Sequence, residues 1–269
     1  YSVSSLLFDQ ADYSILSNDL KPMDRITVSG SLLDENGNPY AGNGTISYTG
    51  YETGTASFTG SAFSLSICKS QDYQLTIQTD GNKYKEINLG TINAAADQTL
   101  AASALQLNSY TVTATAHSNG TISPAKQDVL YGGTATVTAA ANNGYRISRL
   151  LVDGNEESQA KDLKTYDYTF TDVKANHTIS AEFTSKTYTV TKESTSNGRV
   201  NGDSNWKQFS VTADNSFTIT AVPNNGYTLT KIEIDGVVID EKDITFTNGK
   251  YEYTIPSVTK DCDVQVSFA

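Results

Sequence analysis

The chain has 269 residues, a formal net charge of −11 and a sequence pI of about 4.6. An acidic surface repels phosphate groups, so nucleic acid and anionic membranes are excluded as expected partners, and no apolar run is long enough for membrane insertion. Sixteen Tyr residues, together with many Thr, Val and Ile, favour β-strands over helices.

Residues 1–24 begin with the stretch "YSVSSLLF", which predicts one strand. Two placements remain open for it: the last strand of a preceding domain, or an added edge strand on the domain that follows. We favour the second placement. The chain has neither an initiator Met nor a signal peptide, so we expect a piece of a longer, processed or excised protein.

The next stretch, "RITVSGSLLDENGNPYAGNGTISYTG" from Arg25, predicts two strands joined by a polar turn at residues 34–39. It resembles the opening "V-x-G-x-V-x-D-x-x-G-x-P-x-A-G" of carboxypeptidase regulatory-like and related prealbumin-like β-sandwiches of surface proteins. The matching positions are Val28, Gly30, Leu32, Asp34, Gly37, Pro39, Ala41 and Gly42. The resemblance covers about 25–107 and implies a non-catalytic sandwich, so we assign 1–108 to a first domain with an N-terminal extension.

The turn "DENGNP" also has the oxygen-rich composition of a calcium loop. It lacks the twelve-residue frame and the downstream bidentate Glu of such loops. Asp, Asn, Gly and Pro are the residues that a tight turn needs in any case. The turn is the favoured reading, although a structural calcium ion remains an alternative.

The remaining residues contain a tandem duplication. "SYTVTATAHSNG" from Ser109 matches "TYTVTKESTSNG" from Thr187, and "NNGY" occurs at residues 142–145 and again at 224–227. The spacing between equivalent positions grows in small steps, as loops of different length between equivalent strands would produce.

Within each copy the apolar residues alternate with a period of two, which predicts antiparallel strands with one buried face. The Asn-Gly and Asp-Gly pairs predict hairpin turns. The step from Ile147 to Leu150 breaks the alternation, so we expect a bulge or bend at Ser148 and Arg149.

The duplicated pattern resembles the divergent InlB B-repeat family of bacterial cell-surface proteins. The features that match are the opening "YTVT", the following "NG", the block "YGGTATVTAAANNGY", the pairs "VDG" and "IDG", and the closing "AEF" and "VSF". The two copies span 109–185 and 186–269. The resemblance implies spacers or accessory adhesive modules, and it completes the expected fold: all-β, with three small antiparallel β-sandwich-type domains in an elongated tandem.

Candidates for catalysis or metal binding are few. His117 and His177 lack a Cys or Glu cluster at ligand spacing and lack a convincing Ser or Cys partner. Cys68 and Cys262 fall in different predicted domains, so free thiols are favoured over a disulfide. We expect no catalytic residue, no cofactor and no metal.

Trp206, the only tryptophan of the sequence, follows Asp203 and Asn205 in "GDSNWKQF". An exposed indole beside polar side chains is how sugar-binding modules stack a pyranose ring and bind its hydroxyl groups. These three residues form the candidate ligand site. The alternative, which we favour, is that Trp206 packs as a hairpin anchor.

These observations favour a non-catalytic stalk or accessory region of a secreted, adhesin-like bacterial surface protein that presents another domain away from the cell wall. The alternative is a carbohydrate-binding or adhesin module accessory to a secreted glycoside hydrolase, with Trp206 as sugar platform. The expected location is extracellular, the expected state a monomer, and the expected partners cell-wall or host glycans or a host surface protein.

Overall fold

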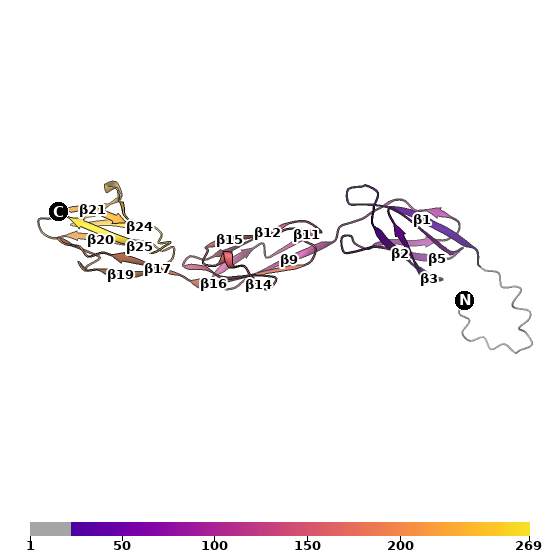
Figure 1. Cartoon of the computed structure of the whole chain (residues 1–269), viewed down its shortest axis with the longest axis horizontal. Coiled ribbons are helices and arrows are strands. Elements are labelled where there is room, and N and C mark those ends of the chain that lie inside the picture. The colour runs from indigo at the N-terminus through magenta and orange to yellow at the C-terminus, as the bar shows by residue number, and fades with distance from the viewer. Residues whose placement is uncertain (1–22) are drawn as a thin grey trace, which may run out of the picture. The chain divides into compact units, whose positions relative to one another are not determined.

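The computed structural model describes residues 23–269, which divide into two compact units, one ending at Ser109 and the other running from Tyr110 to Ala269 (Figure 1). Across the described range the regular elements are β-strands and two three-residue 3₁₀ helices, which confirms the all-β prediction. No helix in this range has the length and apolarity needed to cross a membrane. The strand predicted from "YSVSSLLF" lies outside the described residues.

The first unit is a sandwich of two four-stranded sheets with one apolar core. One sheet has the order β4-β1-β7, with β8 also pairing with β1, and the other has the order β3-β2-β5-β6. The strands are β1 (Arg25–Leu33), β2 (Asn43–Gly50), β3 (Thr53–Thr59), β4 (Ala62–Cys68), β5 (Asp72–Thr79), β6 (Ile87–Asn93), β7 (Gln98–Thr99) and β8 (Ser103–Ala104).

The polar turn after β1 is held by its first residue. The carboxylate of Asp34 accepts hydrogen bonds from the backbone amides of Asn36 at 2.9 Å and Asn38 at 2.8 Å. Gly37 adopts a φ of +82°, which favours glycine. Asp34 therefore serves the turn itself, as an Asx motif does.

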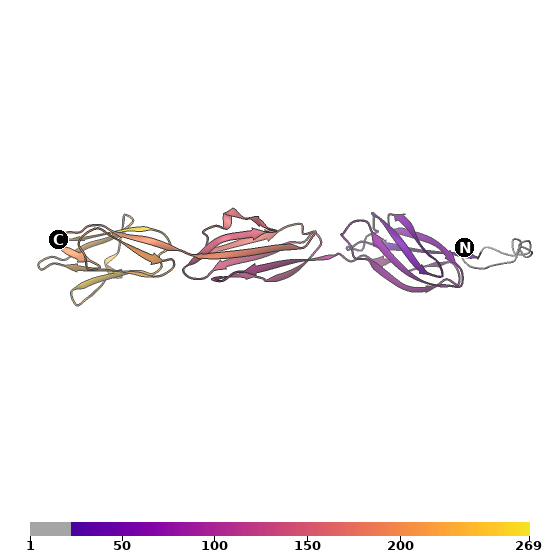
Figure 2. The ribbon, with the colours of Figure 1, turned by 90° about the horizontal axis from the view of Figure 1, so that it is seen from below.

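The first repeat packs a five-stranded sheet, β11-β9-β16-β13-β14, against a three-stranded sheet, β10-β12-β15 (Figure 2). Its strands are β9 (Ser109–Ala116), β10 (Gly120–Ser123), β11 (Lys126–Leu130), β12 (Ala135–Ala141), β13 (Tyr145–Val152), β14 (Asn155–Glu156), β15 (Thr165–Phe170) and β16 (His177–Ser185). The 3₁₀ helix η1 (Ser158–Ala160) precedes β15.

The second repeat has the same topology and one additional strand. Its sheets have the orders β19-β17-β25-β21-β22 and β18-β20-β24-β23, around a core of its own. The elements are β17 (Thr187–Lys192), β18 (Gly198–Val200), β19 (Lys207–Thr212), β20 (Phe217–Pro223), β21 (Leu229–Ile234), β22 (Val237–Val238), η2 (Glu241–Asp243), β23 (Thr245–Thr247), β24 (Lys250–Ile255) and β25 (Cys262–Phe268). The additional strand is β23, which pairs with β24.

The predicted antiparallel β-sandwich domains are confirmed, and most of their strand pairs are antiparallel, but three of the six sheets also contain a parallel pair. In each repeat the first and last strands are parallel neighbours, β9 with β16 and β17 with β25. In the first unit β7 and β8 are parallel to β1. Alternation of apolar residues indicates that one face of a strand is buried. It does not indicate whether the neighbouring strand is parallel or antiparallel, because that depends on which strands the fold brings together.

The turns agree with the prediction in part. Asp153-Gly154 and Asp235-Gly236 close the hairpins β13–β14 and β21–β22, with positive φ at all four residues. The two Asn-Gly pairs of the matching stretches, at 119–120 and 197–198, instead lead from one sheet to the other. The predicted bulge is confirmed by a register shift between Ile147 and Arg149, which recurs between Leu229 and Lys231.

The glycine after each of these asparagines has a packing role. A Cβ atom on Gly120 would overlap the ring of Phe183, and one on Gly198 would overlap the ring of Phe268. These rings come from the last strand of the same repeat. The repeated "NG" and the repeated closing Phe are therefore two halves of one contact, which explains why both recur together.

Candidate functional site

The two repeats meet at a joint with a single connecting residue. β16 ends at Ser185 and β17 begins at Thr187, so only Lys186 lies between them. The amide of Lys186 donates to the carbonyl of Gly144 in the first repeat, at 2.8 Å. The carbonyl of Lys186 accepts from the amide of Ala213 in the second repeat, also at 2.8 Å. The connection is thus bonded to both sides.

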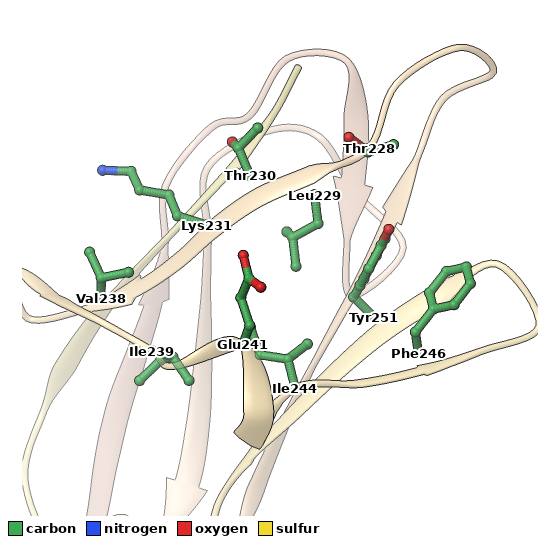
Figure 3. Close-up of a pocket in the computed structure, with 10 residues that line it drawn as sticks. All are labelled: Thr228, Leu229, Thr230, Lys231, Val238, Ile239, Glu241, Ile244, Phe246 and Tyr251. Carbon is green, nitrogen blue, oxygen red and sulfur yellow. The ribbon is translucent and has the colours of Figure 1, made fainter.

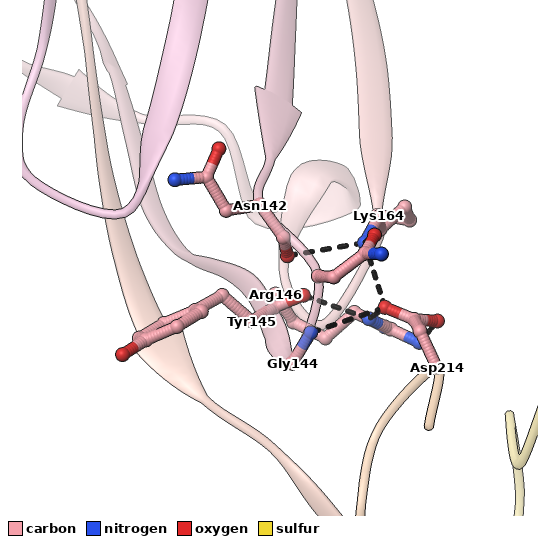
Figure 4. Close-up of polar contacts among 7 residues, drawn as sticks. Asn142, Gly144, Tyr145, Arg146, Lys164 and Asp214 are labelled. Carbon is pink, nitrogen blue, oxygen red and sulfur yellow. Dashed lines mark hydrogen bonds and ion pairs between the residues drawn. The ribbon is translucent and has the colours of Figure 1, made fainter. Parts of the chain in front are cut away.

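A three-residue ionic cluster crosses this joint (Figure 4). Both terminal nitrogens of Arg146 donate to the two carboxylate oxygens of Asp214, each at 2.9 Å. Lys164 donates to the same carboxylate at 2.6 Å, and the amide of Gly144 approaches it at 3.4 Å. The cations come from the first repeat and the anion from the second, so the cluster resists separation of the repeats.

The Arg146–Asp214 pair of this cluster is largely shielded from solvent. Arg146 is only 5% exposed, and its guanidinium also donates to the carbonyl of Tyr145 at 2.7 Å. The guanidinium carbon lies 6.0 Å from the centre of the Tyr188 ring. Hydrogen bonding from Arg146, and then from Lys164, holds the pKa of Asp214 well below its usual value despite burial. Hydrogen bonding to Asp214 raises the pKa of Arg146.

Neither side of this cluster is repeated in the other copy. Aligned on "NNGY", Arg146 corresponds to Thr228, and Asp214 corresponds to Gly132. Gly132 and Asp214 both have positive φ, 78° and 65°, which supports the alignment. In the first copy Lys164 pairs with Ala141, which corresponds to Pro223 in the second copy. The strand register there places Gly249 opposite Pro223, so Gly249 corresponds to Lys164. Each charge is present only in the copy where the joint requires it.

Gly144 permits the close approach of the repeats. It has a φ of +84°, and a Cβ atom there would lie 2.9 Å from Cγ2 of Thr212 in the second repeat. Its counterpart Gly226 has a φ of +88° and no atom within 4 Å of the same position. The left-handed turn is common to both copies, whereas the tight contact belongs to the joint.

The predicted ligand residues lie together in the turn between β18 and β19. Trp206 is 54% exposed, and its backbone amide donates to Oγ of Ser194 at 2.9 Å. The carboxylate of Asp203 accepts from the backbone amide of Asn205 at 2.9 Å and from its side chain at 3.1 Å. Within residues 23–269 the indole has no stacking partner among the aromatic rings.

A buried lysine supports this turn. Lys192 is 2% exposed, and its ammonium donates to the carbonyl of Asp203 at 2.9 Å. Burial lowers the pKa of Lys192. The "YTVT" alignment places Ala114 at this position in the first copy, so the support belongs to the turn that carries Trp206.

Comparison with known proteins agrees with the duplication. The sequence profile of the divergent InlB B-repeat domain matches residues 110–187 and 188–269, which together make up more than half of the chain. The chain belongs to the divergent InlB B-repeat family. Among curated proteins no match is found.

The solved structures to which this chain is similar include three bacterial proteins. The Bacillus anthracis TIE protein is 10% identical with a TM-score of 0.48, over 91% of this chain and 51% of that one. BcpA, the major pilin subunit of Bacillus cereus, is 10% identical with a TM-score of 0.33, over 91% of this chain and 99% of that one. The pilus adhesin SpaC of Lactobacillus rhamnosus GG in its open conformation is 10% identical with a TM-score of 0.25, over 92% of this chain and 43% of that one. The chain thus spans about half the length of the TIE protein.

The remaining candidate residues are the two histidines and the two cysteines. His177 lies 2.7 Å from Asp153, the residue that begins the β13–β14 turn. His117 donates its backbone amide to Ala181 at 3.0 Å. Cys68 and Cys262 are both free and buried, and burial raises the pKa of Cys262. The described part of the chain contains no cluster of three His, Cys, Asp or Glu residues that could hold a metal.

Sequence reasoning assigned no role to Arg146, Lys164 or Asp214. A signal was nevertheless present in the alignment of the two InlB B-repeats. Where the two copies otherwise match, a charged residue in one copy that aligns with Thr or Gly in the other is not required by the shared fold, and so indicates a role specific to that copy. Which of these charges meet could be learned only from the structure.

Proposed function

We propose that this chain is a non-catalytic stalk or spacer of a secreted, adhesin-like bacterial surface protein, which presents another domain away from the cell wall. The observation that carries the proposal is the clamped joint between the two InlB B-repeats. A spacer holds another domain at a fixed distance only if its joints resist bending. Here the two repeats are joined by a one-residue connection and by a buried ion pair.

Other features support the same role. A net charge of −11 favours solubility and a monomeric state. The first unit, whose opening resembles the carboxypeptidase regulatory-like sandwiches, adds a further non-catalytic module under this proposal. The titratable groups described above serve turns, cores or the joint, which is consistent with a chain that performs no chemistry of its own.

The test is whether the two repeats tumble as one body. Residual dipolar couplings of the full chain, measured by NMR, are expected to fit a single alignment tensor across 110–269. Asp214→Ala is expected to require a separate tensor for each repeat. Asp240→Ala is the matched control, since its ion pair with Lys242 is exposed and lies within one repeat. Two tensors in the unaltered chain would contradict the proposal.

The second candidate is carbohydrate binding by Trp206, with Asn205 and Asp203 as polar partners and cell-wall or host glycans as ligands. It is favoured by the exposed indole on a turn that a buried lysine fixes. A glycan array would compare the chain with Trp206→Ala and with Tyr51→Ala, an exposed aromatic of the first unit. Binding lost only in Trp206→Ala would support a lectin-like role, and no binding by the unaltered chain would contradict it.

A further inference from the structure

The second repeat contains an open groove beside β21 (Figure 3). Its volume is about 470 Å³, and it lies between β21 and the segment that runs from Val238 to Tyr251. The apolar side chains that line it are Leu229, Val238, Ile239, Ile244, Phe246 and Tyr251. Phe246 and Val238 are 60% and 56% exposed, so the groove leaves apolar surface in contact with water.

The same place is filled in the first repeat by the chain itself. The amide of Ile147 donates to the carbonyl of Leu163 at 2.9 Å, and the amide of Asp162 donates to the carbonyl of Ile147 at 2.8 Å. Ala160, at the start of this covering segment, is fully buried. Residues 160–163 therefore lie along the outer edge of β13, where Ile147 is fully buried.

In the second repeat the corresponding segment does not cover the edge of β21. Leu229 corresponds to Ile147, but the two hydrogen bonds of Ile147 have no counterpart at Leu229 among the backbone contacts of the described chain. The helix η2 buries none of its residues, and the chain then forms β23 as an added strand beside β24. Leu229 remains partly exposed as a result. The duplicate thus shows what is missing: an extended piece of polypeptide along the edge of β21.

The groove also contains an unmatched negative charge. The carboxylate of Glu241 points into the groove, and no ion pair joins it to another described residue (Figure 3). Lys231, which also lines the groove, is paired with Glu233 at 2.7 Å, and Lys242 is paired with Asp240 at 2.9 Å. The rings of Phe246 and Tyr251 are tilted by 38° to each other, with centres 4.5 Å apart. A carboxylate beside aromatic faces is suited to an ammonium or guanidinium group.

We propose that this groove binds an extended segment of a partner protein that carries a lysine or arginine beside apolar residues. The segment takes the place that residues 160–163 take in the first repeat, with backbone hydrogen bonds to Leu229 and its cation at Glu241. Addition of a strand to an exposed edge is an established form of peptide recognition. The complementary charge favours a basic partner for this acidic chain.

The probe for this site is a synthetic peptide with the covering sequence of the first repeat, SQAKDLKT (residues 158–165), blocked at both ends. It is titrated to millimolar concentration into the full chain and followed by amide chemical shifts. We expect shifts that saturate and centre on Leu229, Phe246 and Tyr251. A peptide with both lysines replaced by glutamine is expected to bind at least about fivefold more weakly, because it loses the charge-assisted contact.

Variants separate the groove from general charge effects. Glu241→Gln is expected to weaken the peptide at least about fivefold, whereas Asp240→Asn, one residue away and already paired with Lys242, is expected to change it less than about twofold. Both side chains are exposed, so both variants should fold. The proposal is wrong if the groove amides do not move, or if Glu241→Gln binds as well as the unaltered chain. It is also wrong if these amides shift with protein concentration alone, because a second copy of the chain would then be the occupant.

Discussion

Arg146 and Asp214 face each other across the joint between the repeats, with two nitrogen–oxygen distances of 2.9 Å. They are 68 residues apart in the chain, and neither is repeated in the other copy. A duplicated fold normally gives both copies the same surface. This pair instead makes the two facing surfaces complementary.

Removal of the negative charge is expected to weaken the joint. Asp214→Asn leaves the buried guanidinium of Arg146 without a counter-charge, which costs on the order of 3 kcal/mol when one partner of a buried pair is lost. Chemical denaturation followed by Trp206 fluorescence reports on the second repeat, since the sequence has one Trp. Asp240→Asn is expected to change the unfolding free energy by less than about 1 kcal/mol. Equal effects of the two variants would show that the joint adds no stability.

The joint is expected to weaken in acid. Arg146 and Lys164 depress the pKa of Asp214 in the folded chain, so its stabilising contribution is present above the unfolded value of 3.8 and is lost as the pH falls through the lower folded value. The neighbouring pair Lys186–Asp162, at 3.7 Å, is exposed and contributes little. Dipolar couplings measured from pH 7 towards pH 2 should fit a single tensor down to the unfolded value of 3.8, and the joint should weaken progressively only below that pH. In Asp214→Asn this pH-dependent step should be absent.

Two equivalent glycines provide a matched comparison. Gly144→Ala and Gly226→Ala both place a side chain in the left-handed region, at a cost of about 1–2 kcal/mol. Gly144→Ala additionally brings a Cβ atom to 2.9 Å from Thr212, so a further destabilisation of about 1–3 kcal/mol is expected. The difference between their denaturation midpoints measures the packing of the joint. Identical midpoints would mean that the contact with Thr212 relaxes without cost.

The contact between glycine and phenylalanine inside each repeat can be tested with a double-mutant cycle. Gly198→Ala is expected to destabilise the second repeat by about 1–3 kcal/mol, because its Cβ atom overlaps the Phe268 ring. In a chain that already carries Phe268→Leu, the same change is expected to cost less, since the smaller side chain leaves room. Additive effects in equilibrium unfolding would contradict the proposed pairing.

Trp206→Ala is expected to leave the fold intact. The indole is 54% exposed, and the turn is held by Lys192 and by the Asp203–Asn205 hydrogen bonds, none of which involves the ring. We expect the free energy of unfolding to change by less than about 1 kcal/mol. Circular dichroism with thermal denaturation would check this. A much larger loss would identify Trp206 as a packing residue and remove it as a sugar platform.

The sequence alone was sufficient for the class of fold and for the duplication, because these depend on local rules. Alternation of apolar residues follows from the two faces of a strand, and Asp-Gly turns follow from the ease of positive φ. The break between Ile147 and Leu150 likewise predicted the bulge. Each of these signals is contained within a few neighbouring residues.

Only the tertiary structure decided where charges meet and which edges stay open. Arg146 and Asp214 become partners because the NNG turn of one repeat lies against the β19–β20 turn of the next, a contact between segments far apart in sequence. The groove at Leu229 exists because the segment after η2 pairs with β24, whereas its counterpart covers β13. Both outcomes depend on competing contacts between distant strands, and a local pattern does not record which contact is the more stable.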